Sequence, residues 1–371
     1  MSLPDPLFQP VQLGALALAH RVVMAPLTRM RSRQPGDVPH ALNAKYYSQR
    51  ASKGGLIVTE ATDISEQSRG YPGAPGIYST EQIAGWRAVT DAVHAKGGLI
   101  VSQIWHTGRV SHTSMQPGGA LPVSASARPV TGTGHMDASG APASFQTPRA
   151  LEIDEIPAIV ESFAQAARNA RDAGFDGVEI HSANGYLLDQ FLQDNVNVRT
   201  DRYGGVIANR MRLLLEVVDA AAAAWQADRI GIRLSPWGKF NDMGDSDPGT
   251  LFHHVATELG HRKLAYLHVV EPRADQSSDV NAIDSSAPDA AALVKAAFGG
   301  KVISAGGYVR ATASAAIAEG RADAVAFGRL FISNPDLPER LRRAAPLNRY
   351  DRTTFYGGGA SGYTDYPALP A

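Results

Sequence analysis

The sequence of 371 residues predicts a (β/α)8 barrel, in a single domain over residues 1–371. Short runs rich in Val, Ile and Leu recur along the chain, and they are apolar nearly throughout, as in parallel strands covered on both faces. Helical patterns separate the runs, which favours a barrel. No Gly-x-Gly-x-x-Gly follows the first run, which disfavours the main alternative, a doubly wound sheet. The eight expected strands are 21–26, 55–60, 99–104, 177–181, 230–235, 265–270, 301–305 and 322–328.

Helix signals lie between these strands. Ser79-Thr-Glu-Gln82 reads as a capping box that opens a helix running to Ala95. Apolar residues at helical spacing predict another helix over 156–167, with Gly174 as its stop. Further helices are expected at 209–225 and 311–319.

Three segments exceed a minimal barrel. Residues 105–149 are rich in Gly, Pro, Ser and Thr and are too long for a simple connection, so we expect an excursion over the barrel mouth after the third strand. The tail 344–371 combines glycines with aromatic rings, which are costly to expose, so it is expected to pack near the active site. Residues 7–18 are expected to pair as a hairpin under the N-terminal end of the barrel.

Composition narrows the classes of function. Thirty-five basic and 36 acidic residues leave a formal charge of −1, so no global field favours nucleic acid or an anionic membrane. No apolar run approaches the span of a bilayer, and the N-terminus lacks the features of a signal peptide. Cysteine is absent, which excludes disulfides, thiolate metal sites and iron–sulfur clusters. We expect a cytoplasmic protein, monomeric or homodimeric, that acts on small molecules and holds no metal.

Barrel enzymes build their sites where strands end. At these positions only Glu60 and Glu271 are acidic, whereas metal-dependent and glycosidic barrels normally need paired carboxylates. No lysine closes a strand, which counts against Schiff-base chemistry. The rim is therefore suited to neutral hydrogen bonding.

The stretch Gly177-Val-Glu-Ile-His181-Ser-Ala-Asn184-Gly-Tyr186 stands out among the strand ends. An apolar run ends on a histidine, and an amide and a phenol follow within one turn. Imidazole and carboxamide donate together to one acceptor oxygen, and a phenol gives up a proton. This spacing favours holding a carbonyl while a neighbouring atom is protonated.

The last two strand ends indicate a phosphate site. Ala305-Gly306-Gly307 and Phe327-Gly328-Arg329 place backbone N–H groups and an arginine where barrels bind phosphate. Arg233 lies inside an apolar run, so its charge needs a partner: either a rim carboxylate or a ligand that becomes anionic.

Neutral groups complete the rim. Thr28, Gln103 and the backbone at Ala61 add donors and acceptors around the same mouth. Together with the cation and the phosphate site, they suit a heteroaromatic ring with an amide-like edge and a phosphate tail.

These residues occur in motifs that resemble the old yellow enzymes, a family of FMN-dependent ene-reductases. The resemblance runs from Leu7 through Tyr366. It rests on Val23-Met-Ala-Pro26-Leu-Thr28-Arg, Gln103-Ile-Trp105-His-Thr-Gly-Arg109, Val178-Glu-Ile-His181-Ser-Ala-Asn184-Gly-Tyr186-Leu-Leu-Asp-Gln-Phe-Leu, Arg199-Thr-Asp-Arg-Tyr203-Gly-Gly, Ile232-Arg233-Leu-Ser-Pro236 and Phe355-Tyr356-Gly-Gly-Gly-Ala-Ser-Gly-Tyr-Thr-Asp-Tyr.

The resemblance implies a non-covalent FMN, NADPH or NADH as reductant, and electron-poor alkenes as substrates. His181 and Asn184 would bind the activating carbonyl or nitro oxygen, and Tyr186 would protonate the α carbon. Arg233 would stabilise the anionic reduced flavin. The implied cofactor contacts are Pro26, Leu27, Thr28, Ala61, Gln103, His181, Arg233, Ala305, Gly306, Gly307, Phe327, Gly328 and Arg329. The implied substrate contacts are Tyr71, Trp105, His181, Asn184, Tyr186, Trp237 and Tyr356.

Two alternatives remain open at this level. A phosphate-handling barrel lyase or isomerase would use His181 and a rim glutamate as acid and base, and its protein would be colourless. A flavin-binding protein without turnover would hold FMN that NADPH does not reduce. Fold alone does not separate these hypotheses, because barrels host many chemistries.

Overall fold

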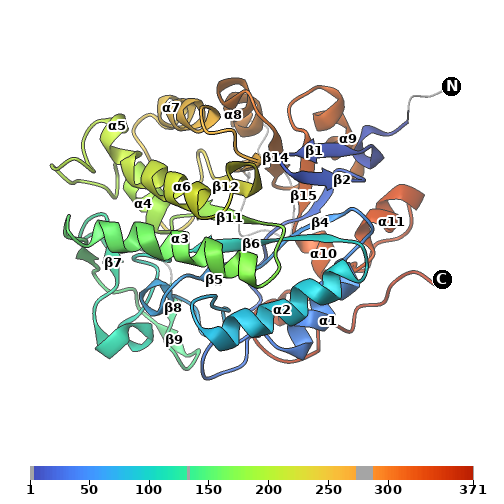
Figure 1. Cartoon of the computed structure of the whole chain (residues 1–371), viewed down its shortest axis with the longest axis horizontal. Helices are drawn as coiled ribbons and strands as arrows, with labels where there is room; N and C mark the ends of the chain where they lie inside the picture. The colour runs from blue at the N-terminus through green and yellow to red at the C-terminus, as the bar shows by residue number, and fades with distance from the viewer. Residues whose placement is uncertain (1–3, 132–133, 273–286, 371) are drawn as a thin grey trace.

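The computed structural model describes residues 4–131, 134–272 and 287–370. Eight parallel strands form a closed barrel, because β15 pairs with β3 and β6 pairs with β11. Helices surround the barrel (Figure 1). The barrel strands are β3 (Val22–Met24), β4 (Leu56–Val58), β6 (Leu99–Trp105), β11 (Gly177–Ser182), β12 (Ile230–Leu234), β13 (Tyr266–Val270), β14 (Val302–Ala305) and β15 (Ala324–Phe327).

The predicted (β/α)8 barrel is thus confirmed, and each expected strand overlaps one of the eight, with both ends within two residues of the expected ones. Every residue of β11 is buried, the polar Glu179, His181 and Ser182 included, as expected for a strand with both faces covered. The helices are α1 (Ala41–Arg50), α2 (Thr80–His94), α3 (Ile156–Asp172), α4 (Leu187–Leu192), α5 (Ile207–Arg210), α6 (Arg212–Ala224), α7 (Pro248–Gly260), α8 (Ala290–Phe298), α9 (Arg310–Ala318), α10 (Arg329–Ser333) and α11 (Leu337–Arg343).

Local signals explain the helix boundaries. Ser79 accepts a hydrogen bond from the Gln82 N–H at 3.2 Å, so the capping box opens α2 as expected. Gly174 adopts φ of 82° directly after α3, a left-handed conformation that ends a helix. The helix expected over 209–225 starts two residues earlier and divides at Met211 into α5 and α6.

The N-terminal hairpin is also present. Strands β1 (Val11–Leu13) and β2 (Leu16–Leu18) pair antiparallel, and Gly14 turns between them with φ of 54°. The Ala15 N–H donates to Asp228, directly before β12, at 2.8 Å. The hairpin therefore closes the N-terminal end of the barrel, where burial of its leucines contributes about 1.5–3 kcal/mol each.

The excursion after β6 contains short strands that the sequence did not predict. Strands β7 and β10 pair in parallel, and β8 and β9 form a small antiparallel pair. Their bounds, with that of the short strand preceding α2, are β5 (Thr62–Asp63), β7 (Val123–Ser124), β8 (His135–Met136), β9 (Pro142–Ala143) and β10 (Arg149–Ala150). No helix of the described residues is long and apolar enough to cross a membrane.

Candidate active site

A cavity of about 550 Å³ lies at the carboxyl ends of the barrel strands. Strands β3, β6, β11, β12, β14 and β15 all contribute residues at or just beyond their ends, which is where barrel enzymes place their chemistry. The excursion adds His135 and Phe145, and the tail adds Phe355 and Tyr356.

Most of the site residues expected from sequence line this cavity. They are Pro26, Leu27, Thr28, Tyr71, Gln103, Trp105, His181, Asn184, Tyr186, Arg233, Ala305, Gly306, Gly307, Phe327, Gly328, Arg329 and Tyr356. Ala61 and Trp237 do not line it: Ala61 is buried in the cluster behind Trp105, and Trp237 packs against the main core.

His181 and Asn184 present side chains that form no hydrogen bond within the described part of the chain, although both line the cavity. The backbone of Asn184 is held instead, because its N–H donates to the Ser235 hydroxyl at 2.8 Å and its carbonyl accepts from Asn241 at 2.9 Å. Asn184 adopts φ of 57°, a conformation costly outside glycine but tolerated by asparagine. Burial, with Arg233 nearby, lowers the pKa of His181 well below 6.5, so its imidazole is neutral.

Tyr186 is fixed by aromatic neighbours and by one polar contact. Its ring meets Trp105 edge to face at 4.6 Å, and its hydroxyl lies 3.3 Å from that of Tyr71. Burial raises the pKa of Tyr186 well above 10, so the phenol carries its proton at neutral pH. A protonated phenol beside two open hydrogen-bonding groups is a ready general acid.

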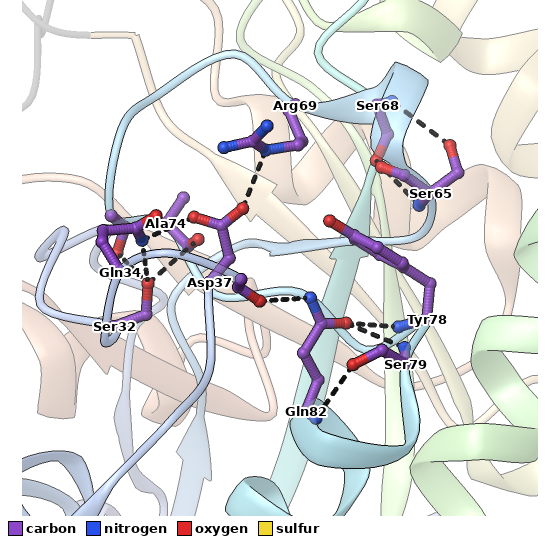
Figure 2. Close-up of polar contacts among 12 residues, drawn as sticks. Ser32, Gln34, Asp37, Ser65, Ser68, Arg69, Ala74, Tyr78, Ser79 and Gln82 are labelled. Carbon is purple, nitrogen blue, oxygen red and sulfur yellow. Dashed lines mark hydrogen bonds and ion pairs between the residues drawn. The ribbon is translucent and has the colours of Figure 1, made fainter. Parts of the chain in front are cut away.

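The loop that carries Tyr71 is clamped by a polar network, shown in Figure 2. Arg69 forms an ion pair with Asp37 at 2.8 Å, and the Ser32 hydroxyl donates to the Gly73 carbonyl at 2.9 Å. The amide of Gln82 donates to the Gly36 carbonyl at 2.9 Å. The first two contacts tie the Tyr71 loop to residues 32–37, and the third ties residues 32–37 to α2, so the backbone on both sides of Tyr71 is held in place.

The far end of the cavity is a backbone cradle. Gly306 and Gly307 adopt φ of 132° and 82°, conformations that side chains rarely tolerate. Within the described ranges the N–H groups of Gly306, Gly307 and Gly328 make no hydrogen bond, and Arg329 lies beside them. Free N–H groups beside a guanidinium are the donor set that a phosphate requires.

Both rim glutamates are engaged elsewhere. Glu60 accepts the N–H groups of Arg29 and Met30 at 3.0 and 3.2 Å. Glu271 accepts the Ser304 hydroxyl at 2.9 Å, as well as two N–H groups at the start of α8. Neither lines the main cavity, so the lyase or isomerase hypothesis lacks its carboxylate base there.

Comparison with known proteins then decides the family. Residues 6–348 match the model of the NADH:flavin oxidoreductase / NADH oxidase family. The chain belongs to this family.

Relatives cover nearly its whole length. A 12-oxophytodienoate reductase 1 of Oryza sativa subsp. japonica is 50% identical over 368 residues, covering 98% of this chain and 93% of the relative. The 12-oxophytodienoate reductase 2 of Arabidopsis thaliana is 47% identical over 98% of this chain and 96% of its own. The solved structure of morphinone reductase in complex with tetrahydroNAD is 48% identical, with a TM-score of 0.91 over 99% of this chain and 98% of that one.

The old yellow enzyme resemblance is thereby confirmed: this enzyme is an NAD(P)H-dependent flavin oxidoreductase whose cofactor is FMN. The cavity fits that cofactor by an independent test. It offers an apolar strand end at Pro26 and Leu27, a partly buried cation at Arg233, and glycine N–H groups that form no hydrogen bond within the described residues and are free for a phosphate. Among the described residues, no group of three or more His, Asp or Glu could hold a metal ion.

Sequence reasoning missed five aromatic or heteroaromatic residues that line the cavity: His135, Phe145, Phe240, Tyr308 and Phe355. Phe240 is half exposed in the loop after β12, and His135 and Phe145 stack at 4.9 Å in the excursion. Because residues 105–149 were expected to lie over the barrel mouth, the aromatic and imidazole rings in this excursion could have been predicted to line the cavity. Nothing in the sequence distinguishes Phe240 from Trp237 in the same loop.

Proposed function

We propose that this flavin enzyme is an ene-reductase: it reduces the carbon–carbon double bond of α,β-unsaturated ketones, aldehydes, maleimides or nitroalkenes. One observation carries the proposal. His181 and Asn184 offer hydrogen-bonding groups that have no partner among the described residues, and the protonated hydroxyl of Tyr186 lies in the same cavity. The relatives' names, 12-oxophytodienoate reductase and morphinone reductase, both describe reduction of an oxo compound.

The side chains of His181 and Asn184, which we call the clamp, act on the activating oxygen of the substrate. Neutral His181 and the Asn184 amide both donate to a carbonyl or nitro oxygen, so electron density is withdrawn from the conjugated β carbon. When bound, FMN reduced by NADPH or NADH would supply the hydride that this carbon accepts. Negative charge then builds on the clamped oxygen, where the two donors stabilise it.

Tyr186 completes the reaction by giving its proton to the α carbon. The added hydride and proton saturate the double bond, and the two electrons come from the nicotinamide. The phenolate left behind is costly in a buried site, so Tyr186 recovers a proton from solvent or from Tyr71, whose hydroxyl is 3.3 Å away.

The remaining expected residues bind the two ligands. We assign the ring of the cofactor to Pro26, Leu27, Thr28, Gln103 and Arg233, and its phosphate to the cradle at 305–307 and 327–329. Tyr71, Trp105 and Tyr356 would form the substrate walls, and we add Phe240 to them in place of Trp237, because only Phe240 lines the cavity.

The visible absorption spectrum tests the proposal directly. Purified protein should show a flavin spectrum that bleaches under anaerobic NADPH or NADH and returns when 2-cyclohexenone is added. Bleaching without return on addition of the enone, or of a maleimide or nitroalkene, would contradict ene-reduction while leaving the flavin enzyme intact.

A further inference from the structure

A buried polar cluster lies inside the barrel directly beneath the cavity. It consists of Gln103, Glu179, Arg233, Tyr266 and His268, which we call the Glu179 cluster. Strand register brings it together: Glu179 lies opposite Gln103 across β11 and β6, and Arg233 lies opposite His268 across β12 and β13. Four of its members are at most 1% exposed.

Glu179 is the hub of the cluster. Its carboxylate accepts from Gln103 Nε2 at 2.7 Å, from the Tyr266 hydroxyl at 3.1 Å, and from His268 Nδ1 at 2.9 Å. Gly231 makes room for this arrangement, since a Cβ there would lie 2.3 Å from the Tyr266 ring.

The bond between Glu179 and Gln103 fixes which end of the amide faces the cavity. A carboxylate only accepts hydrogen bonds, so Gln103 must turn its NH2 group toward Glu179 and its oxygen away. Gln103 lines the cavity, and its oxygen has no partner among the described residues. The cavity thus receives an acceptor at this position.

Glu179 also acts on Arg233 electrostatically, although the two side chains form no hydrogen bond or ion pair within the described residues. Arg233 makes no hydrogen bond or ion pair within the described part of the chain. Burial lowers the pKa of Arg233, and the Glu179 charge acts in the opposite direction. The pKa of Glu179 is lowered although burial opposes this, because His268 and Arg233 lie close. The guanidinium thereby remains charged, and its donors stay available to a ligand.

We propose that Glu179 is a positioning residue for the cofactor: it presents the Gln103 oxygen and the Arg233 guanidinium as an acceptor and a donor for the pyrimidine edge. The imide of a flavin offers the complement, an N–H between two carbonyls. This inference rests on the proposed binding of FMN in this cavity, and it assigns a function to a residue that touches neither cofactor nor substrate.

Glu179→Gln tests the proposal, because it keeps size and shape but removes the charge and allows Gln103 to turn over. The apoprotein should bind FMN at least tenfold more weakly, the loss expected when the Gln103 amide turns a donor toward the imide N–H and one hydrogen bond is lost. The reduction potential of the bound flavin should rise, because a negative charge near the reduced ring has gone. Tyr266→Phe is the matched control: it removes another donor to Glu179 but leaves Gln103 oriented, so FMN affinity should stay within twofold.

A double-mutant cycle separates positioning from general damage. In a Gln103→Leu background, Glu179→Gln should weaken FMN binding less than it does in the wild type, because the amide that it orients is missing and only its effect on Arg233 remains. The rise in potential should persist, since it acts through charge. An equal loss of affinity in both backgrounds, or wild-type affinity and potential in Glu179→Gln, would overturn the proposal.

A wild-type measurement covers the case in which Glu179→Gln does not fold. FMN labelled with ¹⁵N at the imide should show a hydrogen-bonded N–H proton in the wild-type protein that shifts in Gln103→Leu. An imide proton that is unchanged by Gln103→Leu would overturn the proposal. Wild-type protein that binds no FMN would instead refute the function proposed above.

Discussion

Replacing Tyr186 with Phe should remove the proton donor and little else. The ring would remain edge to face on Trp105 at 4.6 Å and against His181 at 4.9 Å, so packing in the site is retained. The lost hydroxyl contacts only the Tyr71 hydroxyl, at 3.3 Å, among the described residues. We therefore expect a folded, yellow variant with normal reduction by nicotinamide.

The loss should fall on the oxidation of the reduced enzyme by an enone. A positioned general acid contributes roughly 10²- to 10⁴-fold to a proton transfer, which corresponds to about 3–5.5 kcal/mol of activation free energy. Anaerobic stopped-flow absorbance measures both half-reactions separately. NADPH bleaching should change less than twofold, whereas reoxidation by 2-cyclohexenone should slow at least a hundredfold.

Tyr71→Phe is the matched control, because it removes the partner hydroxyl and keeps the donor. Burial raises the pKa of Tyr71 to about 12, so it too is protonated, but we expect less than a tenfold loss. Enone reoxidation that survives Tyr186→Phe and fails in Tyr71→Phe would refute the assignment of Tyr186 and name Tyr71 as the donor.

Three further predictions follow from the same structure. His181→Ala with Asn184→Ala should weaken binding of a phenolic ligand at least a hundredfold, because two hydrogen bonds of about 1.5 kcal/mol each are lost; unchanged binding by absorbance titration would remove the clamp. Arg29→Met should release the tail, because the Arg29 guanidinium donates to three carbonyls of residues 354–362. Limited proteolysis should then cut the tail faster than in the wild type. Equal rates of cleavage would show that the tail is held without Arg29. Burial lowers the pKa of His106 to about 3, so only its unfolded form gains a proton as pH falls below 6.5, and stability is lost in that direction. Denaturant unfolding at pH 7 and 5.5 should show a drop about 1 kcal/mol smaller in His106→Gln than in wild type; identical drops would contradict the assignment.

The barrel was predictable because its strands carry a recognisable sequence pattern. Strands with both faces covered are largely apolar: β4 is Leu-Ile-Val and is buried at every position. The two-residue strands β7 to β10 carry no such signal, since two residues establish no period. Strands β7 and β10 pair across most of the excursion, and β8 and β9 pair within it; a pattern of two residues reveals neither pairing.

The site divides in the same way. His181, Asn184 and Tyr186 lie on one short stretch after a strand, so their proximity follows from sequence spacing. Trp237 and Phe240 share one loop, yet only Phe240 faces the cavity, because Trp237 adopts φ of 58° and packs against the core. Backbone turns of this kind depend on tertiary contacts and are not encoded in composition.

Burial gives the three chemical groups of the site their different charge states at one pH. It removes the proton from His181, keeps the proton on Tyr186, and lowers the pKa of Arg233, an effect that the Glu179 charge opposes, so the guanidinium stays charged. A neutral clamp, a protonated acid and a partly buried cation are therefore present together throughout the neutral range. Since the shifts of His181 and Tyr186 both point away from neutrality, neither group should titrate between pH 6.5 and 9. A change in turnover across that range would therefore have to arise from the nicotinamide step or from a group outside this set.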